Sequence, residues 1–174
     1  MTDIHVSVLG GGQTGRRLAE DLVAHSTAGD IRFVDDSEPA VERADANGVH
    51  ATHTPVTDAE SAVVEAATDA EIAVLVGDND GMNLLLAQRL RLRDADLDLV
   101  VLVNDPRNRE AFGALDVETV CVAQATVAAL GVQISELTPM EGGLDAFGRE
   151  CARAIDAEDD RSENGDLTTD RTVG

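Results

Sequence analysis

The chain has 174 residues, enough for one domain with a sizeable core, and its 34 acidic and 13 basic residues give a formal net charge of -21. This charge excludes nucleic acid and anionic lipid as direct partners, because both carry the same sign. No apolar run reaches the roughly 18 residues that a membrane span needs, so we expect no direct membrane insertion and no signal peptide.

The acidic residues are spread along the whole chain, and every basic residue is Arg. An excess of Asp with no Lys is typical of a cytoplasm crowded with salt, where screening lets a highly charged surface persist. We therefore expect a protein of a halophilic archaeon. Cys121 and Cys151 cannot build a disulfide framework and have no His at ligand spacing, which indicates a reduced, cytoplasmic context.

Short apolar runs alternate with stretches of helical periodicity over residues 4–130. This alternation predicts parallel β-α-β units with right-handed crossovers, hence a Rossmann-like, doubly wound α/β sheet with helices on both faces. We expect six strands in the order 3-2-1-4-5-6. The predicted strands cover residues 4–9, 31–34, 49–53, 72–76, 99–103 and 117–122. The predicted helices cover residues 14–25, 39–46, 58–67, 83–92 and 124–130, and a turn at residues 104–106 leads into a further helix through Leu115.

The alternation of apolar runs and helical periodicity becomes less clear beyond Gly131. An amphipathic helix is predicted there by apolar residues at helical spacing, Leu144, Phe147, Cys151 and Ile155. The residues after it are nearly all polar and acidic, with too little apolar surface to offset the entropy of ordering. We therefore expect a nucleotide-binding domain over residues 1–134, a C-terminal amphipathic helix within residues 135–157 and a disordered acidic tail over residues 158–174.

The first predicted strand runs into a glycine-rich turn in which Gly10, Gly12 and Gly15 fit the pattern G-x-G-x-x-G. Gly10 allows the tight turn, Gly12 lets a pyrophosphate approach the backbone, and Gly15 lets the next helix pack closely. Phosphates would then face unpaired N–H groups at the positive end of that helix, where Gln13 and Thr14 lie. Simple packing is the alternative explanation of these glycines.

Asp35 ends the second predicted strand, the position from which a carboxylate accepts hydrogen bonds from both hydroxyls of an adenosine ribose. Asp36 and Ser37 follow, with no Arg directly after them. NAD(H) or an adenine nucleotide is therefore favoured over NADP, whose 2′-phosphate would meet a like charge. The alternative for Asp35 is a helix N-cap or a solvated turn acid.

A second polar cluster follows the fourth predicted strand. Asp80 and Asn83 either line the nucleotide crevice or cap and start the next helix, and the residues alone favour neither. The segment from Asp78 to Gly81 resembles the opening of a calcium loop, but the remaining oxygen ligands are missing, so we expect no metal site.

We expect no catalytic residue. All four histidines lie in the first third of the chain, and the absence of Tyr and Lys excludes the proton relay of short-chain reductases. No Ser or Cys has a plausible base and orienting acid in its sequence context. The sequence favours a site that binds a ligand and does not catalyse.

Together these segments resemble the N-terminal domain of Trk-type potassium-uptake regulators, the RCK or TrkA-N domain. The resemblance covers roughly residues 4–130, and the D-x-x-N after the fourth strand and the N-D-P after the fifth make it more specific than the glycines alone. The segments that carry it are Gly10-Gly11-Gly12-Gln13-Thr14-Gly15, Phe33-Val34-Asp35, residues 73–84 and residues 101–106.

The resemblance implies a Rossmann domain that binds NAD(H), ATP or ADP, dimerises, and gates a membrane potassium transporter or channel from the cytoplasmic side. By the matching motifs, the three glycines would cradle phosphate, Asp35 would hold the ribose, and Asp80 with Asn83 would line the crevice. We expect a cytoplasmic, non-catalytic regulatory homodimer that reaches the membrane only through a protein partner.

Three departures from the family pattern stand out. Thr54-Pro55 occupies the place where the family usually has Gly-Asp, and Leu102 a place where it often has Arg. The usual C-terminal ligand-binding domain is not expected. Two alternatives therefore stay open: a small NAD-dependent oxidoreductase or accessory NAD-binding protein, and an interaction module that no longer binds nucleotide.

Overall fold

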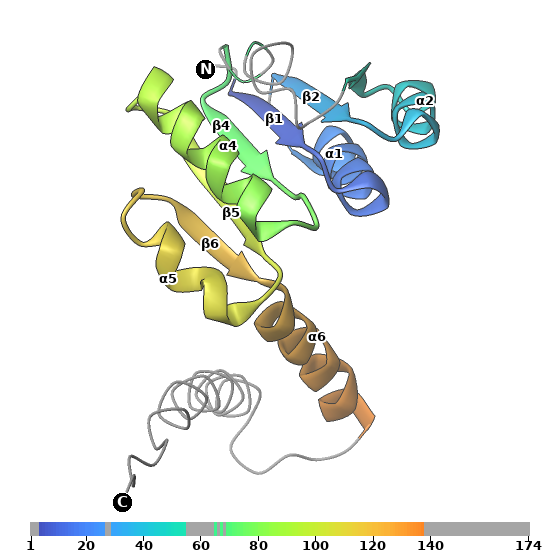
Figure 1. Ribbon diagram of the computed structural model, residues 1–174. Helices are drawn as coiled ribbons and strands as arrows, with labels where there is room; N and C mark the ends of the chain where they lie inside the picture. Colours follow the sequence, from blue (N-terminus) through green and yellow to red (C-terminus); the bar gives the residue numbers. More distant parts are fainter. Residues whose placement is uncertain (1–3, 27–28, 55–64, 66, 68, 138–174) are drawn as a thin grey trace, which may run out of the picture. The chain divides into compact units, whose positions relative to one another are not determined.

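The computed structural model describes residues 4–26, 29–54, 65, 67 and 69–137. These residues build one sheet of six parallel strands in the order β3-β2-β1-β4-β5-β6 (Figure 1). The predicted doubly wound α/β fold and its strand order are confirmed. The strands are β1 (His5–Leu9), β2 (Asp30–Asp35), β3 (His50–His53), β4 (Ile72–Leu75), β5 (Asp98–Val103) and β6 (Glu118–Cys121).

The helices alternate with the strands, and local residues explain where they start and stop. Asn79 is the N-cap of α4 (Asp80–Arg93) and accepts the Met82 N–H at 3.0 Å. Arg91 and Arg93 lie in the last turn of this helix, where cations are favourable. Gly48, at φ 87°, follows the end of the second helix. The helices are α1 (Gly12–His25), α2 (Glu38–Ala46), α4 (Asp80–Arg93), the 3-10 turn η1 (Pro106–Asn108), α5 (Arg109–Phe112) and α6 (Val122–Leu137).

Alternating side chains of the strands fill two apolar clusters. Val8 and Phe33 are fully buried in a cluster that includes residues of α1 and α2. Leu9 and Val34, the next residues along the same strands, belong to a second cluster with residues of α4. Because successive side chains of a strand point to opposite faces, α1 and α2 cover one face of the sheet and α4 covers the other.

Strands β1 and β4 end at paired residues, and β2 runs one residue further at the same edge of the sheet. Leu9 pairs with Val34 of β2 and with Leu75 of β4. Backbone hydrogen bonds continue one residue further, from the Gly10 N–H to the Val34 carbonyl at 2.8 Å and from the Val76 N–H to the Leu9 carbonyl at 3.0 Å. The turns after these strands are therefore held side by side at the carboxyl edge, where open α/β sheets place their ligands.

Two predicted helices differ clearly from the observed ones. The helix predicted from the turn at residues 104–106 through Leu115 is a 3-10 turn followed by the four-residue α5, which stops at Gly113. The helix predicted over residues 124–130 continues to Leu137 as α6, since a single glycine such as Gly131 within a helix costs only about 1 kcal/mol.

Other predictions lie wholly or mainly outside the described residues. Of the helix expected over residues 58–67, only residues 65 and 67 are described, and both are helical. The amphipathic helix within residues 135–157 and the acidic tail over residues 158–174 are not described beyond residue 137. The predicted domain boundaries remain predictions.

Within the described part, residues 105–107 and 121–137 form a compact unit separate from the rest. No charged residue occurs between positions 122 and 135, and Leu130, Val132 and Ile134 of α6 are exposed. No helix in the described part of the chain is both long enough and apolar enough to span a membrane.

Candidate functional site

The turn between β1 and α1 has left-handed backbone at three successive glycines. The φ angles of Gly10, Gly11 and Gly12 are 77°, 87° and 50°. Residues with a side chain rarely adopt this conformation, so the turn depends on glycine. Gly11 is the N-cap of α1, and the helix starts at Gly12, directly at the carboxyl edge of the sheet.

The glycines of this turn differ in what surrounds them. A Cβ at Gly15 would lie 2.0 Å from the Gly10 carbonyl oxygen and 2.9 Å from Phe33 Cε2, which agrees with the predicted close packing of helix on strand. A Cβ at Gly11 would lie 2.7 Å from the Val76 carbonyl oxygen. At Gly12, by contrast, a Cβ would meet no atom within 4 Å. The turn is therefore packed on the protein side and open at Gly12.

Asp35 lies beneath this turn and is only 1% exposed. Its Oδ2 accepts the Gly12 N–H at 2.8 Å, and its Oδ1 accepts the Ser37 N–H at 2.7 Å. The carboxylate therefore ties the glycine turn to the turn that begins α2, and it is not the solvated turn acid considered as an alternative.

The amide donors at the start of α1 are partly used, which corrects the expectation that they are unpaired. The Gly12 N–H donates to Asp35, and the Thr14 N–H donates to the Gly11 carbonyl at 2.9 Å. Gln13 and Thr14 are exposed on this first turn, as a ligand contact would require. An anion would be attracted by the positive helix end but would compete with Asp35 for the Gly12 N–H.

Arg16, one turn further along α1, is held by its neighbours. Its guanidinium pairs with Glu20 and donates to Gln13 Oε1 from NH2 at 2.9 Å. Burial alone raises the pKa of Glu20, but hydrogen bonds from Asn47 and Arg16 outweigh burial and keep that pKa below its ordinary value. Arg16 thus contributes to the contact of α1 with the turn after α2.

Asp80 and Asn83 are buried at the carboxyl ends of β4 and β5, 9% and 1% exposed. Asn83 Nδ2 donates to the Gly77 carbonyl at 2.8 Å and to the Leu102 carbonyl at 3.0 Å. A Cβ at Gly77 would lie 2.5 Å from Asn83 Oδ1, so this arrangement needs glycine there. Asn79 caps α4, and Asp80 is its first residue, so the capping role considered for Asp80 belongs to its neighbour.

Asp80 also accepts hydrogen bonds from residues that were not predicted to be its partners. Its Oδ1 accepts the backbone N–H and the side-chain Nδ2 of Asn104, both at 2.8 Å, and its Oδ2 accepts Asn108 Nδ2 at 2.8 Å. Asn104 is the first residue of the N-D-P motif, the one signal that could have indicated the contact. Asp80 and Asn83 therefore fix the turns after β4 and β5 from inside the protein.

The structure thus contains a glycine turn at the start of a helix and a buried carboxylate, Asp35, below it. It also contains a polar lock between β4 and β5, which is the hydrogen-bonded set of Asp80, Asn83, Asn104 and Asn108. The TrkA-N domain family matches residues 6–123, more than half of the chain. This chain belongs to that family. The resemblance stated from the sequence is confirmed. No curated protein matches the chain.

Solved structures share the fold of this TrkA-N domain at low sequence identity. The NAD(P)-binding domain of an exopolyphosphatase-related protein from Archaeoglobus fulgidus has a TM-score of 0.64 and 24% identity, covering 75% of this chain and 97% of that one. The Kef CTD of Shewanella denitrificans in AMP-bound form has a TM-score of 0.63 and 18% identity, with 91% and 92% covered. The TrkA-N domain of the inner membrane protein YbaL from Escherichia coli has a TM-score of 0.62 and 16% identity, with 77% and 97% covered. Dehydrogenases also occur among the similar folds, so the fold alone does not decide between binding and catalysis.

Proposed function

We propose that this TrkA-N domain binds an adenine nucleotide, either NAD(H), ATP or ADP, at the glycine turn and senses it without catalysing a reaction. The observation that carries the proposal is the contrast within the turn. Gly11 and Gly15 face protein atoms at less than 3.0 Å from a Cβ position, whereas Gly12 faces open space at the start of α1. Gly10, Gly12 and Gly15, with the exposed Gln13 and Thr14, would hold phosphate at this helix end.

Asp35 is the proposed ribose acceptor, with Asp36 beside it as a second acid that disfavours a 2′-phosphate. Asp80 and Asn83 would act on the ligand by holding the two turns that border the other half of the crevice. The AMP-bound form of the Kef CTD, which shares this fold, supports including AMP among the nucleotides tested.

The domain would act as a cytoplasmic regulatory subunit of a potassium transport system. Membership of the TrkA-N family supports this role, and so does the occurrence of a TrkA-N domain in the inner membrane protein YbaL. We propose that it works as a homodimer and is peripheral at the membrane through a transporter or channel subunit. A signal needs two states with different nucleotide affinity, and an interface between copies is the simplest element with two states.

Calorimetric titration of the full chain with NADH, NAD, ATP, ADP and AMP in molar KCl tests the binding step. Gly12→Val should weaken binding at least about tenfold, because the branched side chain occupies the open space at the turn. Gly48→Val is the matched control: Gly48 also has a positive φ and an open Cβ position, but it follows α2, away from the turn. Its affinity should equal that of the parent.

Asp35→Asn should also weaken nucleotide binding, because it removes one of the two acceptor oxygens. The amide has the same shape and keeps one oxygen for one of the two backbone N–H donors, Gly12 or Ser37. No measurable binding by the parent would support the interaction module, and unchanged affinity in both site variants would mean that the nucleotide binds away from the glycine turn. Turnover of NAD(H) with any substrate would support the oxidoreductase. Co-purification from native membranes in high salt, with and without nucleotide, tests the transporter: a chain found only as a free monomer, indifferent to ligand, would remove the regulatory role.

A further inference from the structure

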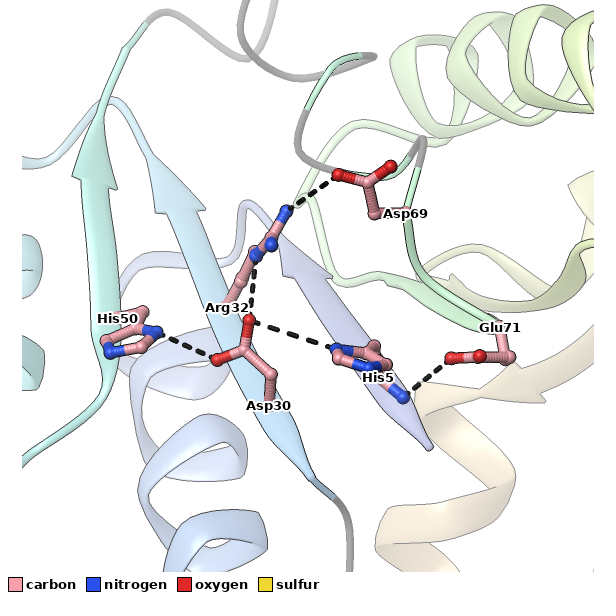
Figure 2. A network of polar contacts seen from close by, with 6 residues as sticks. All are labelled: His5, Asp30, Arg32, His50, Asp69 and Glu71. Carbon is pink, nitrogen blue, oxygen red and sulfur yellow. Dashed lines mark hydrogen bonds and ion pairs between the residues drawn. The ribbon is translucent and has the colours of Figure 1, made fainter. Parts of the chain in front are cut away.

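A second polar network lies at the amino edge of the sheet, at the opposite ends of the strands from the glycine turn (Figure 2). His5, Asp30 and His50 are the first residues of β1, β2 and β3. His5 pairs with Asp30 in the sheet register, and Arg32 pairs with His50. The starts of three neighbouring strands therefore meet at one carboxylate.

Asp30 is surrounded by groups that carry or can acquire positive charge. Its Oδ1 lies 2.8 Å from His50 Nδ1, and its Oδ2 accepts Arg32 Nε at 3.0 Å. His5 Nδ1 lies 4.0 Å from the same Oδ2, too far for a hydrogen bond. Figure 2 shows both imidazoles turned toward the carboxylate from either side.

His5 is the incomplete member of the network. Its Nδ1 is shielded from solvent and has no hydrogen-bond partner, although the side chain as a whole is 41% exposed. The backbone of His5 is fixed, since its N–H donates to Glu71 Oε2 at 2.7 Å and its carbonyl accepts the Glu71 N–H at 3.1 Å. The ring nitrogen is thus held near Asp30 without a bond to it.

The network is short of positive charge when both imidazoles are neutral. Asp30, Asp69 and Glu71 supply three carboxylates against the single guanidinium of Arg32, whose NH1 lies 3.8 Å from Asp69 Oδ2. Asp98, at the start of β5, adds another acid to this edge through its backbone bond to Glu71. Protonating both histidines supplies two positive charges and balances the first three carboxylates.

We propose that His5, Asp30 and His50 form a proton-operated clamp on the amino ends of β1, β2 and β3. When a proton from solvent adds to each imidazole, both ring nitrogens become donors. His5 Nδ1–H then donates to Asp30 Oδ2, and the bond from His50 becomes charge-assisted. The described residues hold no group of three or more His, Cys, Asp and Glu placed for a metal ion.

Thermal unfolding of the full chain in molar KCl without nucleotide tests the clamp independently of the proposed function. The melting temperature of the parent should rise by about 2–4 °C between pH 8 and pH 6, the shift expected from roughly 1 kcal/mol in a chain of this size. In the double variant His5→Asn/His50→Asn, an amide can take the place of each Nδ1 donor but cannot be charged, so most of this rise should be lost.

The matched control is His25→Asn/His53→Asn, which removes the same number of imidazoles outside the network. Their ring nitrogens contact the backbone carbonyls of Asp21 and Asp36. This control should keep most of the rise. An equal rise in the two double variants, or none in the parent, would overturn the clamp. If His5→Asn/His50→Asn does not fold, the single variants decide. His5→Asn should then lose more of the rise in melting temperature than His25→Asn does.

Discussion

The two edges of the sheet hold their carboxylates in different ways. At the carboxyl edge, Asp35 and Asp80 are buried and accept hydrogen bonds from backbone N–H groups and Asn amides, donors that do not titrate. At the amino edge, Asp30 accepts from a guanidinium and an imidazole. The carboxylates are therefore held by donors that do not titrate at one edge and, on the proposed clamp, by donors that gain a proton as the pH falls at the other.

The largest expected effect breaks the carboxyl edge at Gly15. Gly15→Ala would place a Cβ 2.0 Å from the Gly10 carbonyl oxygen, which belongs to the backbone of the turn and cannot move away cheaply. We expect a loss of about 3 kcal/mol or more in unfolding free energy, measured by urea denaturation in molar KCl. Gly12→Ala is the control, because its Cβ meets open space and only the left-handed backbone costs about 1–2 kcal/mol. Equal losses would show that the turn is not packed as described.

Asp80 tests the other half of the same edge. Asp80→Ala leaves three donors of Asn104 and Asn108 without their acceptor, which should cost about 2–3 kcal/mol. Asp78→Ala removes an exposed acid two residues away and should change the stability by less than about 0.5 kcal/mol. Hydrogen exchange of the turns after β4 and β5 should rise in the first variant alone. A stable Asp80→Ala chain would mean that the polar lock carries little of the stability.

Much of this carboxyl edge could be predicted from sequence, because its determinants are local. The glycine spacing fixes the turn, and the alternation of apolar runs and helical periodicity gives the strand order. Contacts between distant residues were not accessible in the same way. The partners of Asp80 are 24 and 28 residues away, and those of Asp30 on β1 and β3 depend on register. The predicted end of α6 at residue 130 is wrong, because the helical periodicity becomes less clear beyond Gly131 although the helix continues.

Salt concentration distinguishes the edges without mutation. With 34 acids against 13 basic residues, self-repulsion should weaken as the Debye length falls from about 10 Å at 0.1 M to about 3 Å at 1 M. We expect the melting temperature to rise by several degrees over this range, equally with KCl and NaCl. In low salt, amide exchange should increase first at the amino ends of β1 to β3, where the carboxylates outnumber the cations. A melting temperature that is flat with salt would contradict the expected halophilic adaptation.

The smallest expected effect appears at a pH below 6 and concerns Asp30. Burial alone raises the pKa of Asp30, but hydrogen bonds from Arg32 and His50, and their charges, outweigh burial and lower it. A carboxyl whose pKa is lower in the folded chain stabilises the fold above its unfolded pKa, about 3.9, and this contribution disappears as the pH falls through the folded value. Stability should therefore decline below about pH 4, and Asp30→Asn should make the decline shallower by at most about 1 kcal/mol, because Asp30 and Arg32 are partly exposed.

Urea denaturation at pH 6, 4 and 3 measures the difference, with Asp45→Asn, an exposed acid of α2, as the control for the change in net charge. A decline of equal steepness in the parent and both variants would show that Asp30 is not held by its cations, and the contrast between the edges would then rest on the carboxyl edge alone.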